Sequence, residues 1–278
     1  MAVDLHMHST FSDGSESPTA IAAMAAAAGL SGIALTDHDV LDGIPEARAA
    51  AAERGLRFIG GTELSVLWRE QSMHMLVYFL EPGPGPIQDR LEDLRRGRHT
   101  RNLEMVDKLR DLGLDISYDE VAREAGTGVV GRPHFAAVLI AKGYVDSVPA
   151  AFDRYLASGR PAYVPRMRLT AEEAIGLSRE SRAVAVIAHP HTLHLRADEF
   201  SIGFRELVAR GLGGIEAYYG EYTPEMRNRI AEICAELGIV ATGGSDFHGK
   251  YKPHLAVGVG TGDLRVPDEV MDQLEQIR

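Results

Sequence analysis

Short apolar segments that read as strands alternate with helical segments along much of this 278-residue chain. The segments predicted as strands are Gly32–Thr36, Leu56–Gly60, Ala183–Ala188, Gly214–Tyr218 and Ile239–Thr242. Repeated alternation of this kind is typical of a parallel sheet covered by helices and closed, or nearly closed, into a barrel. A full barrel takes about 250 residues, so the chain is long enough for one. We therefore predict an α/β fold with a barrel-like parallel sheet.

A helical stretch interrupts this alternation. The run Glu81–Pro86, with the sequence EPGPGP, is the clearest break in composition and predicts a hinge into a different unit. From Gln88 to about Leu156 the pattern is helical, with no convincing strand. We predict two parts: a barrel made of residues 1–82 and 166–278, and a helical insertion of residues 83–165 that would cover the active site.

Two histidines and an aspartate near the beginning of the sequence predict part of a metal site. His6 and His8 are two residues apart in a segment that reads as a short strand, so their side chains would point to the same face. Asp13 follows in a loop, close enough to fold back over them. Zinc, manganese or iron would need further ligands from elsewhere in the chain to complete such a site.

Further histidines and carboxylates stand at or just past the ends of the predicted strands. The full candidate set is His6, His8, Asp13, His38, Glu63, His74, His189, Asp246 and His248. A lone histidine at a strand end is more often a packing or surface residue than a ligand. A set of this size at the carboxyl ends of barrel strands instead predicts a metal centre on the functional face. His74 is an exception, because it stands at the start of the predicted strand His74–Leu80.

The composition and net charge of the chain limit its expected binding partners and its expected cellular compartment. The formal net charge of −11 argues against binding of duplex DNA, although a local positive pocket for a small phosphorylated substrate is compatible with it. The single cysteine, Cys234, excludes a disulfide framework and a cysteine-based zinc site. No stretch is apolar enough for a signal region or a membrane span, so we expect a cytoplasmic protein that does not bind membranes.

The motifs that carry these candidate ligands resemble those of the polymerase and histidinol phosphatase (PHP) superfamily. The matching segments are Asp4-Leu5-His6-Met7-His8-Ser9, Thr36-Asp37-His38-Asp39, Glu63, His74, Ala188-His189-Pro190 and Ser245-Asp246-Phe247-His248. The resemblance covers both ends of the chain. It implies a distorted seven-stranded (β/α) barrel with two or three divalent metal ions at the carboxyl ends of the strands.

The same resemblance implies a grouping of the ligands. His6, His8, Glu63 and Asp246 would hold one metal ion and form the catalytic set. Glu63 would bridge to a second ion held also by His74 and His189. The third ion would be held by Asp13, His38 and His248. Nitrogen and oxygen ligands without thiolate suit manganese, which we expect, as well as iron or zinc.

Within the superfamily, the insertion is similar to that of small phosphoesterases acting on nucleoside 3′,5′-bisphosphates, a group that includes 5′-3′ exoribonucleases. The similarity rests on the segment Gly131-Arg132-Pro133-His134-Phe135 and on the size of the insertion. It implies that Arg132 and His134 bind a second phosphate away from the metals, with Arg98 as a further candidate. Arginine can grip a phosphate with two parallel hydrogen bonds.

The resemblance thus implies a metal-dependent phosphatase that converts pAp to AMP and phosphate, with 5′-3′ trimming of short RNA as a related activity. Divalent metals would activate water and neutralise the phosphoryl oxygens. Asp4, Asp37 and Asp39 would accept hydrogen bonds from the ligand imidazoles and fix their tautomers.

Two alternatives stay open at this point: a histidinol-phosphatase-like enzyme, and a non-catalytic barrel stabilised by metal. The sequence does not fix the native metal, which phosphate lies on the metals, whether the main substrate is a free nucleotide or an RNA end, or the oligomeric state.

Overall fold

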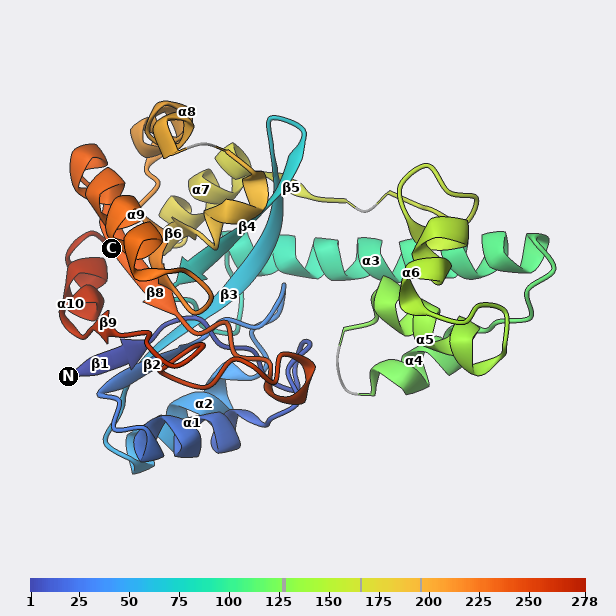
Figure 1. Ribbon diagram of the computed structural model, residues 1–278, viewed down its shortest axis with the longest axis horizontal. Helices are drawn as coiled ribbons and strands as arrows, with labels where there is room; N and C mark the ends of the chain where they lie inside the picture. Colours follow the sequence, from blue (N-terminus) through green and yellow to red (C-terminus); the bar gives the residue numbers. More distant parts are fainter. Residues whose placement is uncertain (127–128, 166, 196) are drawn as a thin grey trace. The chain divides into compact units, whose positions relative to one another are not determined.

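The computed structural model describes residues 1–126, 129–165, 167–195 and 197–278. The chain forms two compact units (Figure 1). Residues Met1–Arg90 and Arg168–Arg278 make up the first, which we call the barrel unit. Residues Leu91–Met167 make up the second, which we call the insertion unit.

The barrel unit is built on one mixed sheet with helices on its outer sides. Its strands are β1 (Ala2–Asp4), β2 (Gly32–Leu35), β3 (Arg57–Trp68), β4 (Gln71–Tyr78), β5 (Leu169–Thr170), β6 (Val184–Ile187), β7 (Gly214–Tyr219), β8 (Val240–Gly244) and β9 (Val266–Pro267). Its helices are α1 (Pro18–Ala27), α2 (Ile44–Glu53), α7 (Ala171–Glu180), α8 (Ala197–Arg210), α9 (Pro224–Leu237) and α10 (Glu269–Gln276). The strand order is β8-β7-β6-β4-β3-β2-β1-β9, with β5 paired to β3.

Backbone hydrogen bonds bring the two ends of the sheet together. The N–H of Leu5 donates to the carbonyl of Gly243 at 3.1 Å, and the N–H of Asp246 donates to the carbonyl of His6 at 2.8 Å. A Cβ atom at Gly244 would lie only 2.4 Å from the Cβ of His6, so glycine permits this close approach. The predicted α/β barrel with a helical insertion is confirmed, and its closure places the residues after β1 beside those after β8.

The sheet is not parallel throughout. This corrects the predicted start of the strand that carries His74 and explains why His74 lies beside the other candidate ligands. β4 runs antiparallel to both β3 and β6. The predicted strand start at His74 was wrong, because β4 begins at Gln71 and pairs His74 with Ser65 of β3. The first half of an antiparallel strand lies at the carboxyl edge of its parallel neighbours. His74 therefore lies at the same edge as the other candidate ligands, although it stands early in its strand.

A buried apolar cluster fills the inside of the curved sheet. It joins residues from strands far apart in the strand order, such as Val3 of β1, Tyr78 of β4 and Val240 of β8, and α10 adds Met271 and Leu274. The hydroxyl of fully buried Tyr78 donates to the carbonyl of Leu5 at 2.8 Å. This bond ties β4 to the segment that leads directly into His6.

Replacing Tyr78 with Phe is expected to lower the free energy of unfolding by about 1 to 2 kcal/mol, because the buried Leu5 carbonyl loses its hydroxyl donor. Urea-induced unfolding measures the effect. Tyr251→Phe is the matched control, since Tyr251 is exposed and its loss of a hydroxyl should change the free energy of unfolding by less than about 0.5 kcal/mol. Equal stability of the two variants would contradict the role assigned to the Tyr78 hydroxyl.

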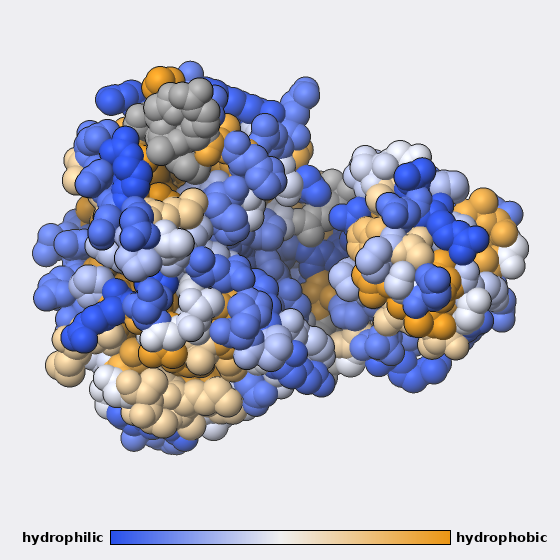
Figure 2. All heavy atoms as spheres, viewed as in Figure 1, coloured by the Kyte–Doolittle hydropathy of each residue, from blue (hydrophilic) through white to orange (hydrophobic). Residues whose placement is uncertain are grey.

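The outer helices pack in two groups. Helices α1 and α2 lie together along one side of the sheet, and α7, α8 and α9 gather on another (Figure 1). Helix α1 begins with Pro18 in its first turn, and the Ser17 hydroxyl accepts a hydrogen bond from the N–H of Ala20. Much of the face shown in Figure 2 is hydrophilic, with a pale apolar area over α1 and α2, where Met24 is exposed.

The insertion unit has a separate apolar core. Its helices are α4 (Tyr118–Ala125), α5 (Arg132–Ala141) and α6 (Val148–Ala151), the last continuing as a π-helical turn over Phe152–Leu156, together with most of α3 (Pro86–Asp111). Fully buried Met105, Leu109, Phe135 and Leu139 lie in one cluster. Among the residues that the structure describes, no helix is long and apolar enough to cross a membrane.

Candidate metal centre

The nine candidate ligands meet at the carboxyl edge of the barrel sheet. Each lies within one of four groups whose ligand atoms are all within 4.8 Å of one another. The groups are His6–Glu63–His189, His6–His8–Asp246, His38–Glu63–His74 and His8–Asp13–His38–His248. They share members, so they form one continuous cluster. Folding thus brings together residues that span 242 positions of sequence, from His6 to His248.

Glu63 lies at the centre of this cluster. Its Oε1 is 2.9 Å from both His74 Nδ1 and His189 Nε2. Its Oε2 lies 3.1 Å from His8 Nε2 and 3.3 Å from the Nε2 atoms of His6 and His38. Burial alone would raise the pKa of the Glu63 carboxyl, but the surrounding imidazoles, His38 and His74 first, hold this pKa well below its usual range. The two oxygens of Glu63 thus face different sets of imidazoles.

His6, His8 and Asp246 form a second part of the cluster. The Nε2 atoms of His6 and His8 are 3.1 Å apart, and Asp246 Oδ1 lies 3.6 Å from the first and 3.4 Å from the second. Burial opposes protonation of His8, yet Asp246 and Glu63 raise its pKa to about 10. Asp246 has a φ of 56°, a left-handed conformation uncommon for aspartate, which turns its carboxylate toward these two imidazoles.

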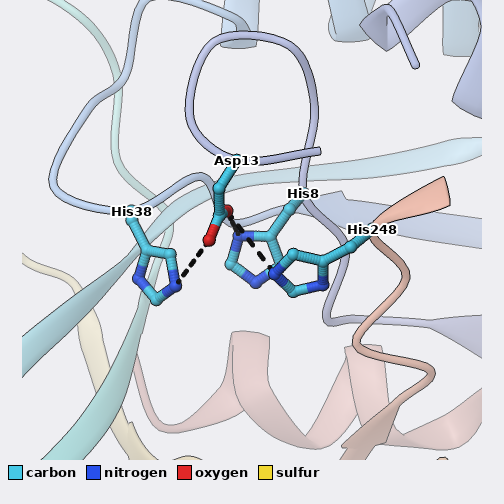
Figure 3. Close-up of side chains that lie close together, drawn as sticks. All are labelled: His8, Asp13, His38 and His248. Carbon is cyan, nitrogen blue, oxygen red and sulfur yellow. Dashed lines mark ion pairs between the residues drawn. The ribbon is translucent and has the colours of Figure 1, made fainter. Parts of the chain in front are cut away.

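Asp13 gathers three imidazoles at the outer side of the cluster (Figure 3). Its carboxylate oxygens lie 3.5 Å from His8 Nδ1, 3.7 Å from His38 Nε2 and 3.4 Å from His248 Nε2. Burial would raise the pKa of Asp13, but His38, His248 and His8 outweigh it and lower this pKa. Burial lowers the pKa of His38 to about 4 despite Glu63 and Asp13. The Asp13 side chain is 47 % exposed, so this side of the cluster faces solvent.

The spacing of these ligand atoms fits bound divalent metal ions. Metal bonds to imidazole nitrogen and carboxylate oxygen are about 2.0 to 2.2 Å long, which places neighbouring ligand atoms about 3 to 3.5 Å apart. The separations among His6, His8 and Glu63 are 3.1 to 3.3 Å. Two imidazole nitrogens at 3.1 Å, both also facing a carboxylate, are typical of atoms that share one cation. The chain therefore has a donor set for more than one divalent ion.

The substrate-phosphate candidates lie in the insertion unit. Arg132 begins α5, its Nη1 donates to the carbonyl of Leu156 at 3.3 Å, and its guanidinium lies over the rings of Phe152 and Tyr163. Within the described part of the chain, no carboxylate forms an ion pair with Arg132. His134 Nδ1 accepts a hydrogen bond from the N–H of Gly131 at 3.0 Å. Arg98 lies on α3.

Two of the three aspartates expected to support the imidazoles, Asp4 and Asp37, accept hydrogen bonds from other groups. Asp4 accepts hydrogen bonds from the backbone N–H groups of His6, Ser245 and Gly258. Asp37 accepts from the backbone N–H of Ser9 and from the hydroxyls of Ser9 and Ser12. Asp39 has a φ of 55°, and its N–H donates to the carbonyl of Glu63. Asp4 and Asp37 thus hold the ligand-bearing loops through backbone and serine groups.

Three residues beside the candidate ligands were not predicted from the sequence to belong to the site. Glu216 of β7 accepts a hydrogen bond from His6 Nδ1 at 2.9 Å. The Tyr219 hydroxyl donates to Asp246 Oδ2 at 2.9 Å, and Lys252 Nζ lies 2.5 Å from the same oxygen. For Glu216 the sequence does contain an indication of such a role, because it is an acidic residue inside the apolar strand GIEAYY. A buried carboxylate needs partners, so its position in a strand indicated a polar contact.

Comparison with known proteins identifies the class of this chain. The PHP domain family matches residues 4–126. The chain belongs to the PHP family, and it is a metal-dependent phosphoesterase.

Several known proteins are similar to this chain over most of its length. The chain is 34% identical over 247 residues to a 3′,5′-nucleoside bisphosphate phosphatase of Chromobacterium violaceum, covering 88% of this chain and 87% of that one. It is also 34% identical over 249 residues to a 5′-3′ exoribonuclease of Haemophilus influenzae, covering 88% and 89%. A solved structure from Bifidobacterium adolescentis, described as a metal-dependent phosphoesterase, has a TM-score of 0.80 and 30% identity, covering 99% of this chain and 96% of that one.

Proposed function

We propose that this phosphoesterase hydrolyses a phosphate from nucleoside 3′,5′-bisphosphates, converting pAp to AMP and phosphate, and that it also trims short RNA from the 5′ end. The observation that carries the proposal is the convergence of nine ligand-type side chains, Glu63 among them, in one cluster. It occurs in a chain 34% identical to relatives named for these two activities.

The proposed ligands are those that the sequence indicated. His6, His8, Glu63 and Asp246 would hold one divalent ion, and Glu63 would share a second with His74 and His189. Asp13, His38 and His248 would hold a third, with His8 near the same position. When bound, divalent ions of this kind, manganese in our proposal, activate water and neutralise the phosphoryl oxygens.

The chain's own residues prepare the reaction in other ways. In the overall reaction water adds to phosphorus, the ester P–O bond breaks, and the leaving alkoxide takes up a proton. Glu63 is buried and its side chain is only 1 % exposed, so the reacting phosphate meets a site from which bulk water is largely excluded on that side. Asp13 is exposed, and the substrate phosphate enters from that side of the cluster.

Arg132 is proposed to bind the second phosphate of the bisphosphate, with His134 and Arg98 as further contacts. The two aromatic rings and the Leu156 carbonyl hold the guanidinium in place while leaving other N–H donors for a ligand. Its position at the start of α5 adds the favourable end of the helix dipole for an anion.

Phosphate release from pAp, AMP and histidinol phosphate by the manganese-loaded protein tests this proposal. We expect a strong preference for pAp. Arg132→Ala should lower kcat/KM for pAp by about 10- to 100-fold, because a charge-assisted contact to phosphate contributes about 1.5 to 3 kcal/mol. The rate on AMP should stay unchanged.

Arg154→Ala is the matched control for this experiment. Arg154 lies in the same unit, over the ring of Tyr155, and donates to a backbone carbonyl as Arg132 does. Its loss should leave both rates unchanged. Equal rates on pAp and AMP, with no effect of Arg132→Ala, would reject the bisphosphate assignment, and a preference for histidinol phosphate would favour that alternative substrate.

A further inference from the structure

Glu216 is a buried carboxylate that joins two of the proposed metal ligands. It lies in β7, is fully buried, and uses its two oxygens for different donors. Its Oε1 accepts from His6 Nδ1 at 2.9 Å, and its Oε2 accepts from the backbone N–H of His189 at 2.7 Å. His6 and His189 come from segments 183 residues apart in the sequence.

The contact between Glu216 and His6 determines which ring nitrogen of His6 is left to face the cluster. A hydrogen bond from Nδ1–H to a carboxylate sets the tautomer, because the proton stays on Nδ1 and the lone pair is left on Nε2. His6 Nε2 is the atom that faces His8 Nε2 at 3.1 Å and Glu63 Oε2 at 3.3 Å. The carboxylate of Glu216 therefore directs the metal-binding nitrogen of His6 into the cluster.

The contact with His189 fixes a backbone conformation. His189 has a φ of 26°, which L-residues rarely adopt and which is costly to maintain without support. The backbone N–H of His189 is held by Glu216 at 2.7 Å, while its side-chain Nε2 lies 2.9 Å from Glu63 Oε1. The bond to Glu216 therefore supports the turn that carries the His189 imidazole toward Glu63.

We propose that Glu216 is a positioning residue that prepares His6 and His189 together, on the two sides of the Glu63 carboxylate, for the pair of metal ions that Glu63 shares. This inference rests on the proposed ligand set. Because His6 approaches Glu63 Oε2 and His189 approaches Glu63 Oε1, loss of Glu216 disturbs both positions of the pair. In the part of the chain that the structure describes, Glu216 forms its hydrogen bonds with His6 and His189 and none with the Asp13–His38–His248 group, which keeps its own geometry.

Glu216→Gln is the sharpest variant, because glutamine keeps the size of the side chain but offers one acceptor and one donor group in place of two acceptors. Either His6 Nδ1–H or the His189 N–H must then face an NH₂ group. Equilibrium dialysis with Mn²⁺ should show affinity at the shared pair weakened by about 10- to 100-fold. Affinity of the remaining site should stay within the error of the measurement.

Two further variants separate positioning from folding and from the ligand assignment. Thr170→Ala removes the hydroxyl that caps α7, so it should lower the Tm of the metal-free protein without changing Mn²⁺ affinity. His6→Ala removes a proposed ligand and should abolish binding at the shared pair. Normal Mn²⁺ binding by Glu216→Gln beside lost binding by His6→Ala would overturn the inference alone, whereas normal binding by His6→Ala would overturn the ligand set.

A measurement on the unaltered protein keeps the inference testable even if Glu216→Gln does not fold. Histidine ¹⁵N spectra, with the His6 signals assigned by their loss in His6→Ala, report which ring nitrogen carries the proton. We expect Nδ1–H in the metal-free protein, retained after Mg²⁺ or Zn²⁺ is added as a diamagnetic probe. A His6 ring whose only proton is on Nε2 in the metal-free protein, or loss of the Nδ1 proton on metal binding, would overturn the positioning role.

Discussion

Replacing Glu63 with Gln is expected to lower kcat/KM for phosphate release by about a thousandfold, which corresponds to about 4 kcal/mol of transition-state stabilisation. Five imidazole nitrogens, on His6, His8, His38, His74 and His189, lie within 3.3 Å of the two Glu63 oxygens. Glutamine offers one oxygen and one NH₂ group, so it can serve only one side of the proposed bridge. Bound metals contribute several kcal/mol to reactions of this class.

Metal content and turnover, measured on the same samples, check this prediction. Glu63→Gln should retain less metal than the wild-type protein after dialysis, and its residual activity should not recover at saturating manganese. Glu81→Gln is the control, because Glu81 is an exposed carboxylate that pairs with Arg48. Wild-type metal content together with wild-type turnover in Glu63→Gln would rule out a bridging role for this carboxylate.

The sequence was sufficient to predict which side chains form the candidate cluster, because these residues stand in short motifs. His6 and His8 are two residues apart, as are Asp246 and His248, and each pair follows a strand of the barrel. Barrel strands end at one edge, so ligands at several strand ends had to converge. Alternation of strands and helices then gave the fold class without any knowledge of strand order.

Strand direction was harder to predict, because the turn between β3 and β4 lacks the usual turn residues. Arg69 and Glu70 both have positive φ values, 47° and 65°, where asparagine or glycine would be expected. Without that signal, the continuous strand over Arg57–Trp68 was predicted to stop at Gly60. Antiparallel pairing with β4 became visible only in the structure, and with it the reason that His74 joins the cluster.

The residues that support the ligands were harder to predict because their role depends on long-range contacts. Nothing near Glu216 in the sequence indicates that its partners are His6 and His189. Asp4 and Asp37 are adjacent to motif residues, yet their donors are backbone N–H groups and serine hydroxyls. Short motifs thus indicate the candidate ligands, whereas the residues that orient these ligands depend on how distant strands pack.

Metal affinity should rise steeply with pH, because binding must displace protons from the cluster. Asp246 and Glu63 overcome the effect of burial and raise the pKa of His8 to about 10, and the carboxylates around His6, Glu216 first, raise its pKa well above its usual value. His8 is therefore protonated in the metal-free protein at pH 7. A metal bond requires the neutral imidazole, so each proton displaced makes the apparent affinity about tenfold stronger per pH unit.

The proton displaced from His8 predicts that manganese affinity rises by about tenfold per pH unit between about pH 7 and 8. Calorimetry in buffers of different ionisation enthalpy counts the protons directly. His8→Gln should remove most of this pH dependence. His38→Gln should weaken binding without changing the slope, since burial lowers the pKa of His38 to about 4 and it is already neutral. Affinity independent of pH would contradict proton displacement.

The raised pKa of His8 makes the metal-free fold less stable as the pH rises, in contrast to its effect on metal affinity. Protonated His8 lies 3.1 Å from Glu63 and 3.4 Å from Asp246, so its charge stabilises the folded state. Because the folded-state pKa of about 10 exceeds the unfolded value of about 6.5, this contribution is fully present below pH 6.5 and is lost as the pH rises through 10. Metal ions stabilise the fold increasingly over the same range, because binding to the native state strengthens there. Thermal unfolding with and without manganese should therefore give Tm values that differ little at pH 6 and diverge as the pH rises.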